Sequence, residues 1–200
     1  SMEGVRPMSS DMRLYWERFA EDGKWRGSSR PPGHELAVLR RGLGREPGAV
    51  PELWSFYTQL DSAGELTRQL RAEHVALGLY GIHQQGEAQP VHLEKVPFGR
   101  AVADLRNSGR HSPEAIDRRF VSAATADSVD EVAVHLRSII QLLKTLPRIR
   151  PIDYTELYWD LVFWQDPNKI GKVRRGWGSA YYLYNSASEE HINSDTKERS

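Results

Sequence analysis

The chain of 200 residues contains no cysteine. This absence excludes a disulfide scaffold, a thiolate metal site and a cysteine nucleophile, and it favours a reducing compartment such as the cytoplasm. No apolar run reaches the roughly 18 to 20 residues that cross a bilayer, and no charged-then-apolar leader opens the sequence. We therefore expect a cytoplasmic protein without a membrane partner. Ser1, which precedes Met2, is interpreted as a cloning remnant.

The sequence also has no net charge, because 27 basic residues balance 27 acidic ones. A uniformly basic composition, typical of many nucleic-acid-binding proteins, is thereby excluded. Two segments are nevertheless basic. Residues 24–45 contain six basic side chains and one acid, and residues 167–188 contain four basic side chains and no acid. Binding of nucleic acid would therefore have to depend on local clusters of charge.

Helical spacing of apolar residues runs along most of the chain, without sustained strand alternation. In the first half, the pattern predicts helices over residues 12–19, 34–41, 50–60 and 65–80. Ser10 or Asp11 can cap the first helix, and Gly42 can end the second in a left-handed conformation. The segment 82–97 is rich in glycine and proline and is the longest predicted loop.

The second half has clearer helix signals. Ser112, Ser128 and Asp153 each stand at an N-cap position before an apolar helical pattern. Five helices are predicted, over residues 99–107, 113–124, 129–143, 154–164 and 170–184. The expected fold is all-α, with two packed helical bundles and no significant sheet. The bundles would span residues 10–97 and 98–184, between a disordered segment 1–9 and a flexible tail 185–200.

A search for catalytic chemistry finds no recognisable site. The seven histidines show no metal-binding spacing, so neither a metal site nor another cofactor is expected. Gly42-Leu43-Gly44 begins like a dinucleotide fingerprint, but Pro47 stands where the third glycine belongs. The acids on the predicted helices, Asp104, Asp117 and Asp160, are explained as solvated or capping residues. The sequence therefore predicts no enzyme.

Basic residues near aromatic ones are the remaining signal. Arginine and lysine can hold a nucleic-acid backbone without reading its sequence. For each single arginine, a solvated helix face or an ion pair with a neighbouring acid explains the residue equally well. Most tryptophans stand on apolar stripes and are predicted to fill the core, namely Trp16, Trp54, Trp159 and Trp164. The roles of Trp177 and Tyr181, which lie near basic residues, stay open.

The order of several short motifs resembles the CasB family, the small subunit of the type I-E CRISPR surveillance complex Cascade. The resemblance runs from about Leu14 to Tyr184. It is carried by Leu39-Arg40-Arg41-Gly42, Phe98-Gly99-Arg100-Ala101-Val102-Ala103, Arg118-Arg119-Phe120, His135-Leu136-Arg137 and Asp153-Tyr154. A basic C-terminal helix follows the last of these motifs. The family is all-helical, as is the fold predicted from the periodicity.

The resemblance implies a non-catalytic subunit that lies beside a second copy of itself, between the backbone subunits and the large subunit of Cascade. Its basic surface would stabilise the heteroduplex of guide RNA and target DNA, and the displaced strand of the R-loop. The basic positions that match the family pattern are Arg40, Arg41, Arg100, Arg110, Arg118, Arg119, Arg137, Lys172, Arg174 and Arg175.

Three alternatives remain at the level of the sequence. A structural subunit could use its aromatic residues for protein contacts and its arginines for ion pairs, without touching nucleic acid. A free-standing helical regulator of duplex DNA would need a recognition helix after a tight turn, which no helix pair here resembles convincingly. A helical enzyme would need a site that the sequence does not display.

Overall fold

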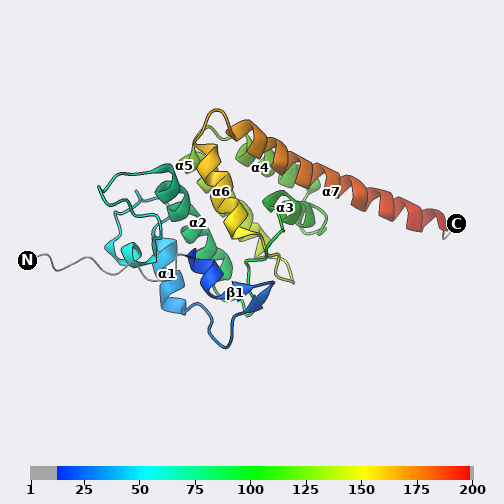
Figure 1. Ribbon diagram of the computed structural model, residues 1–200. Helices are drawn as coiled ribbons and strands as arrows, with labels where there is room; N and C mark the ends of the chain where they lie inside the picture. The colour runs from blue at the N-terminus through cyan, green and yellow to red at the C-terminus, as the bar shows by residue number, and fades with distance from the viewer. Residues whose placement is uncertain (1–12, 199–200) are drawn as a thin grey trace, which may run out of the picture.

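The computed structural model describes the backbone of residues 13–198 and the side chains of residues 13–184 (Figure 1). Its elements, in chain order, are the 3-10 helix η1 (Tyr15–Arg18), strands β1 (Ala20–Glu21) and β2 (Lys24–Trp25), helix α1 (Gly33–Arg41), the 3-10 helix η2 (Pro51–Phe56), and helices α2 (Arg68–Gln84), α3 (Phe98–Arg106), α4 (Pro113–Ala124), α5 (Val129–Leu143), α6 (Tyr154–Trp164) and α7 (Ile170–Glu198). The predicted all-α fold is confirmed, with one two-stranded hairpin as its minor sheet.

Helix α2 lies at the centre of the fold, and α1, α5 and α6 pack against it. It is buried nearly all round, as expected of a helix that is covered on every side. Its crossing with α1 is close at Gly81, where an added Cβ atom would lie 2.8 Å from the carbonyl oxygen of Leu36. Because α2 contacts α5 and α6, residues before and after position 97 share one hydrophobic core. The division into bundles at that position stays a prediction.

The C-terminal half packs α3 against α7 and α4 against α5. Gly99 allows the close approach of α3 to α7, since a Cβ atom there would lie 2.5 Å from the carbonyl oxygen of Trp177. Trp177 and Tyr181 of α7, whose roles the sequence left open, are both buried and pack in the core. Helix α7 continues to Glu198 and leaves the body of the molecule (Figure 1). The segment predicted as a flexible tail is thus helical over residues 185–198.

The predicted first helix is wrong within the described residues. Only Tyr15–Arg18 form a helical turn, and the chain then enters the β1–β2 hairpin. Asp22 and Gly23 both have positive φ, 51° and 76°, as a tight Asp-Gly hairpin turn requires. This turn chemistry outweighs the apolar spacing before it. The predicted caps, Ser10 and Asp11, lie outside the described residues.

Two further predictions fail because of tertiary contacts around α2. Gly42 is not left-handed, with φ −71°; it is needed because a Cβ atom would lie 2.7 Å from Cδ1 of Leu53. The helix predicted over residues 50–60 is only the 3-10 helix η2. The buried carboxylate of Glu73 accepts the backbone N–H groups of Thr58 and Gln59, at 2.8 and 3.0 Å, and so ends the helical pattern there.

Helix α2 also runs four residues beyond its predicted end. His83 and Gln84 fall in the predicted loop, but both are buried and hydrogen-bonded. Nζ of Lys144 donates to the carbonyl oxygens of His83 and Gln85, at 3.0 and 2.6 Å. A lysine at these orphaned carbonyls stabilises the C-terminus of a helix. The remainder of the loop forms one parallel bridge, between His92 and Ile152.

The predicted N-caps of the second half are confirmed. The side-chain oxygens of Ser112, Ser128 and Asp153 accept from the backbone N–H groups three residues further on, at 3.2, 3.1 and 3.0 Å. Each bond satisfies a donor that the first helical turn leaves without a partner. These caps place the starts of α4, α5 and α6.

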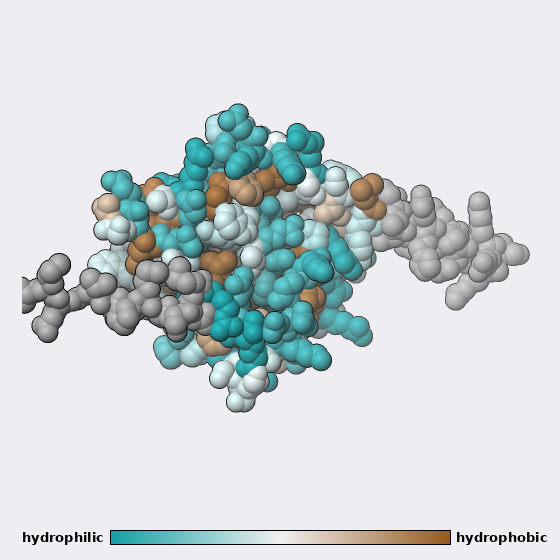
Figure 2. Space-filling view, viewed as in Figure 1, coloured by the Kyte–Doolittle hydropathy of each residue, from teal (hydrophilic) through white to brown (hydrophobic). Residues whose placement is uncertain are grey.

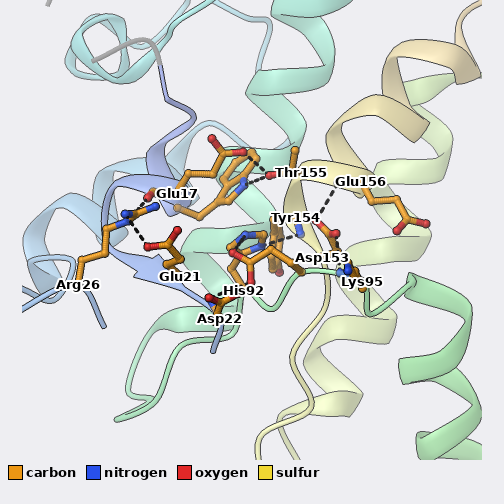
Figure 3. A network of polar contacts seen from close by, with 12 residues as sticks. Glu17, Glu21, Asp22, Arg26, His92, Lys95, Asp153, Tyr154, Thr155 and Glu156 are labelled. Atoms are coloured by element: carbon orange, nitrogen blue, oxygen red, sulfur yellow. Dashed lines mark hydrogen bonds and ion pairs between the residues drawn. The ribbon is translucent and has the colours of Figure 1, made fainter. Parts of the chain in front are cut away.

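A polar network joins the N-terminal segment to the start of α6 (Figure 3). Nε1 of Trp16 donates to Oγ1 of Thr155 at 3.0 Å, and that hydroxyl donates to Glu17. Nδ1 of the buried His92 accepts the backbone N–H of Tyr154 at 3.0 Å, and burial lowers the pKa of His92. The network satisfies its buried polar groups internally, so we assign it a structural role.

Candidate nucleic-acid interface

The ten predicted basic residues do not form one continuous surface. Eight have exposed side chains: Arg41, Arg100, Arg110, Arg118, Arg119, Arg137, Lys172 and Arg175. Arg40 and Arg174 are half-buried, and in each the Nε atom is buried without a hydrogen-bond partner. The exposed residues therefore have to be considered separately from these two.

Helices α4 and α5 bring part of the predicted set together. Nη1 of Arg119 donates to Oγ of Ser138 on α5 at 2.5 Å. Arg118 precedes Arg119 on α4, and Arg137 precedes Ser138 on α5. The residues that the sequence places 18 positions apart, Arg119 and Arg137, are thus carried by helices in contact. All three arginines are exposed.

Arg137 also lines a hollow of about 460 Å³ between the 43–47 loop, α2 and α5, which we call the basic hollow. Arg45 and Arg71 line it with Arg137, together with the acids Glu46 and Asp130. Nη1 of Arg71 lies 3.8 Å from Oδ2 of Asp130, a long ion pair whose acid is largely exposed. Exposed pairs of this kind contribute little to stability. Three arginines around one concave surface can bind phosphate oxygens.

The loop that carries Arg45 is held by the buried His74. Nε2 of His74 lies 2.8 Å from the carbonyl oxygens of both Gly42 and Arg45. The hydroxyl of Tyr57 lies 2.7 Å from Nδ1. Burial lowers the pKa of His74, so the ring is neutral near pH 7, donates from Nε2 to the carbonyls and accepts at Nδ1. The basic hollow therefore has a fixed rim.

Sequence reasoning selected Arg137 but missed two of its neighbours. Arg45 belongs to the basic segment 24–45, yet it was not matched to the family pattern. Arg71 stands in the first turn of a helix that was recognised only by its apolar residues. Its proximity to Arg137 depends on the packing of α2 against α5, which no local pattern contains.

The basic side chains at the start of α7 contact different parts of the molecule. Nη2 of Arg174 donates to the carbonyl oxygen of Ala126 at 2.8 Å, and its guanidinium carbon lies 5.4 Å from the centroid of the Trp164 ring. Lys172 instead lines a separate hollow between α6 and α7, with Asp160. The predicted group at the start of α7 is therefore not one surface, and the guanidinium of Arg174 is bound within the molecule.

Two other predicted residues also make contacts within the molecule. Arg40 packs over the α1–α2 crossing, where its Cγ would lie 3.1 Å from a Cβ atom added at Gly81. The guanidinium carbon of Arg100 lies 5.3 Å from the centroid of the Tyr184 ring. Arg110 is exposed in the connection between α3 and α4.

Asp160 differs from the solvated acid that was predicted. It lies on α6, and Oδ2 accepts from Nε1 of Trp177 at 2.8 Å. Burial raises the pKa of Asp160 to about 7, against the lowering effect of that hydrogen bond. Asp117 is likewise engaged, with Arg106 at 3.0 Å and with the hydroxyl of Tyr181.

The tryptophan predictions hold for two residues and fail for two. Trp16 and Trp164 are buried, whereas Trp54 and Trp159 have 53% and 46% of their surface exposed. Among residues 13–184, whose side chains the structure describes, no cluster of three or more histidine or acidic side chains could hold a metal ion. Over the same range, no helix combines the length and apolar character needed to span a membrane.

Comparisons with known proteins agree with this architecture. The family model for CRISPR-associated protein Cse2 matches residues 35–182. The crystal structure of CasB from Thermobifida fusca is 29% identical, with a TM-score of 0.59, and the match covers 74% of this chain and 84% of that one. The CasB crystal structure from M. ruber is 28% identical, with a TM-score of 0.64, over 82% and 91% of the two chains.

A crystal structure of CasB from Thermus thermophilus, 24% identical with a TM-score of 0.56 over 74% of this chain and 84% of that one, has the same fold. The comparison with curated proteins finds no match. The family model spans most of the helical body, from α1 into α7, and includes the arginines of α4 and α5. The chain therefore belongs to the Cse2 (CasB) family of Cascade-associated CRISPR proteins.

Proposed function

We propose that this chain is a non-catalytic small subunit of type I-E Cascade that stabilises the R-loop through contacts with nucleic-acid backbone. One observation carries the proposal: Arg119 and Arg137 are exposed on helices in contact, and Arg137 lines the basic hollow with Arg45 and Arg71. Its partners would be the backbone and large subunits, a second copy of itself, guide RNA and target DNA. It would act in the cytoplasm and need no cofactor.

The energetics of R-loop formation suit a subunit with few contacts. The heteroduplex that forms is about as stable as the DNA duplex that it replaces, so modest backbone contacts can shift the balance. Base pairing with the guide supplies the sequence specificity. Arginines that bind phosphate are sufficient for such a subunit, because it needs affinity and no base readout.

A second candidate function is a purely structural subunit. Arg40, Arg100 and Arg174 favour it. The stem of Arg40 packs at the α1–α2 crossing, and the guanidinium groups of Arg100 and Arg174 contact residues of their own chain. Arg45 and Arg137 favour the first function, since their exposed side chains line one concave surface, and Arg119 is exposed on α4, which packs against α5. The two functions differ in whether reversing the charge of that surface changes R-loop lifetime.

The test uses Cascade assembled with the full-length chain. The double variant Arg119→Glu/Arg137→Glu is expected to shorten R-loop lifetime at least several-fold while the complex still assembles, because two phosphate contacts become repulsive. The control is Arg148→Glu, an exposed arginine after α5, which should leave the lifetime unchanged. An unchanged lifetime in a correctly assembled double variant would favour the structural function.

A further inference from the structure

A second hollow lies next to the basic hollow, on the other side of Pro47. It has a volume of about 370 Å³ and is lined by residues 47–48, by Trp54, by residues 60–61 and 64–66, and by Leu70 near the start of α2. Pro47 lines both hollows, so they are neighbours that share one residue of the 43–48 loop. We call the second one the aromatic hollow.

The aromatic hollow exposes large apolar side chains. Trp54 has 53% of its surface exposed, and Leu60 and Leu66 have 52% and 37%. On the face that Figure 2 shows, hydrophobic residues lie among hydrophilic ones. A contiguous exposed apolar group on a folded chain indicates a binding surface more often than a single exposed side chain does.

The ring of Trp54 is held in place. Its Nε1 atom donates to the carbonyl oxygen of Gly48 at 2.8 Å, and Gly48 adopts a φ of 87° that favours glycine. The loop that fixes the indole is thus the same loop that carries Arg45. A ring already held in one orientation loses little conformational entropy when a planar group stacks on it.

The charges around the two hollows differ. Three arginines and two acids line the basic hollow, whereas the charged residues that line the aromatic hollow are both acids, Asp61 and Glu65. Oδ2 of Asp61 accepts the backbone N–H groups of Ala63 and Glu65, at 2.9 and 3.2 Å, so this carboxylate is occupied by its own turn. A phosphate would be repelled from the aromatic hollow and attracted to the basic one. An uncharged planar group suits the aromatic hollow.

We propose that a single-stranded nucleic acid crosses the 43–48 loop, with one base stacked on Trp54 and the adjoining phosphates in the basic hollow. This inference rests on the proposed function and adds to it a stacking site for one base, at Trp54. Bases of a single strand expose their faces, whereas those of a duplex are stacked on each other. Stacking on an aromatic side chain with arginines along the backbone is the general mode of sequence-tolerant single-strand binding.

The test is binding of fluorescein-labelled oligothymidine to the full-length chain at low salt, followed by anisotropy. Trp54→Ala is expected to weaken binding about tenfold, the effect typical of losing one stacked base. Trp54→Phe should restore most of the affinity, because it keeps an aromatic face. Trp159→Ala removes a similarly exposed tryptophan on α6 and should change nothing.

The outcomes separate this inference from the proposed function. If Trp54→Ala binds like the wild type while Arg45→Gln/Arg137→Gln binds more weakly, stacking on Trp54 is wrong, and phosphate binding in the basic hollow is supported. If neither variant differs from the wild type, or the wild type does not bind, both the stacking and direct strand binding by this surface are overturned. Equal losses with Trp54→Ala and Trp159→Ala would also contradict a specific role for Trp54.

Discussion

Arg174 and Arg175 are adjacent and chemically identical, yet the fold uses them differently. The guanidinium of Arg174 donates to the carbonyl oxygen of Ala126 and lies over Trp164, which itself donates to the same carbonyl at 3.0 Å. The side chain of Arg175 is exposed. Arg174 therefore fastens α7 to the α4–α5 connection, and charge reversal at this position would test the fold as much as any binding.

Replacing Arg174 should accordingly reduce stability. Arg174→Ala removes a hydrogen bond and a cation–π contact, each of about 1 kcal/mol, so we expect the free energy of unfolding to fall by about 2 kcal/mol. Urea denaturation measures this change. Arg175→Ala is the matched control and should stay within about 0.5 kcal/mol of the wild type. Equal stability of the two variants would refute the structural role of Arg174.

At this scale, the sequence identifies residue types but not their partners. Arg174 interacts with Ala126, 48 positions earlier, and nothing near Arg174 in the chain signals that contact. Trp54 and Trp159 were assigned to the core because they fall on apolar stripes, but the elements that carry them present those side chains to solvent. Asp160, expected to be solvated or capping, is half-buried and hydrogen-bonded to Trp177. Burial of a single side chain depends on which elements pack over it.

Among the elements, locally encoded features were predicted well. The N-caps at Ser112, Ser128 and Asp153 and the helices that follow them are properties of a few neighbouring residues, and the structure confirms them. The extension of α2 to Gln84 has no local signal, because its stabilising groups are Lys144, at the C-cap of α5, and Tyr154, in α6. Helix ends stabilised from a distance leave no local signal.

The crossing of α3 and α7 gives a prediction about these elements. Gly99→Ala would place a methyl group 2.5 Å from the carbonyl oxygen of Trp177. Since backbone atoms cannot move aside without shifting α7, we expect a loss of about 2 to 3 kcal/mol in the free energy of unfolding. Thermal and urea denaturation would show it.

Gly176 in α7 provides the opposite case for the same substitution. A Cβ atom there meets nothing within 4 Å. Gly176→Ala should raise the free energy of unfolding by up to about 1 kcal/mol, because alanine favours the helix over glycine. The test is whether the two substitutions change the free energy of unfolding in opposite directions. Destabilisation of similar size at both glycines would mean that α7 does not pack on α3 as described.

For the whole molecule, the distribution of charge matters more than its total. The chain is neutral, yet the fold gathers Arg45, Arg71 and Arg137 from three separate segments around one hollow. The sequence predicted Arg137 through family resemblance, and the family is confirmed. It did not predict the hollow, because that surface exists only after α2 packs against α5. In contrast, the predicted group at Lys172, Arg174 and Arg175 is separated in the fold, because Arg174 contacts Ala126 and Lys172 lines the hollow beside Asp160.

The measurement that tests the account most directly is the salt dependence of single-strand binding by the full-length chain. On a single strand, log K falls with log salt by about 0.7 per phosphate neutralised. Arg45→Gln/Arg137→Gln should therefore reduce the slope by about 1.4, whereas Arg148→Gln should leave it unchanged. A folded double variant with the slope of the wild type would contradict the assignment of the basic hollow as a phosphate-binding surface.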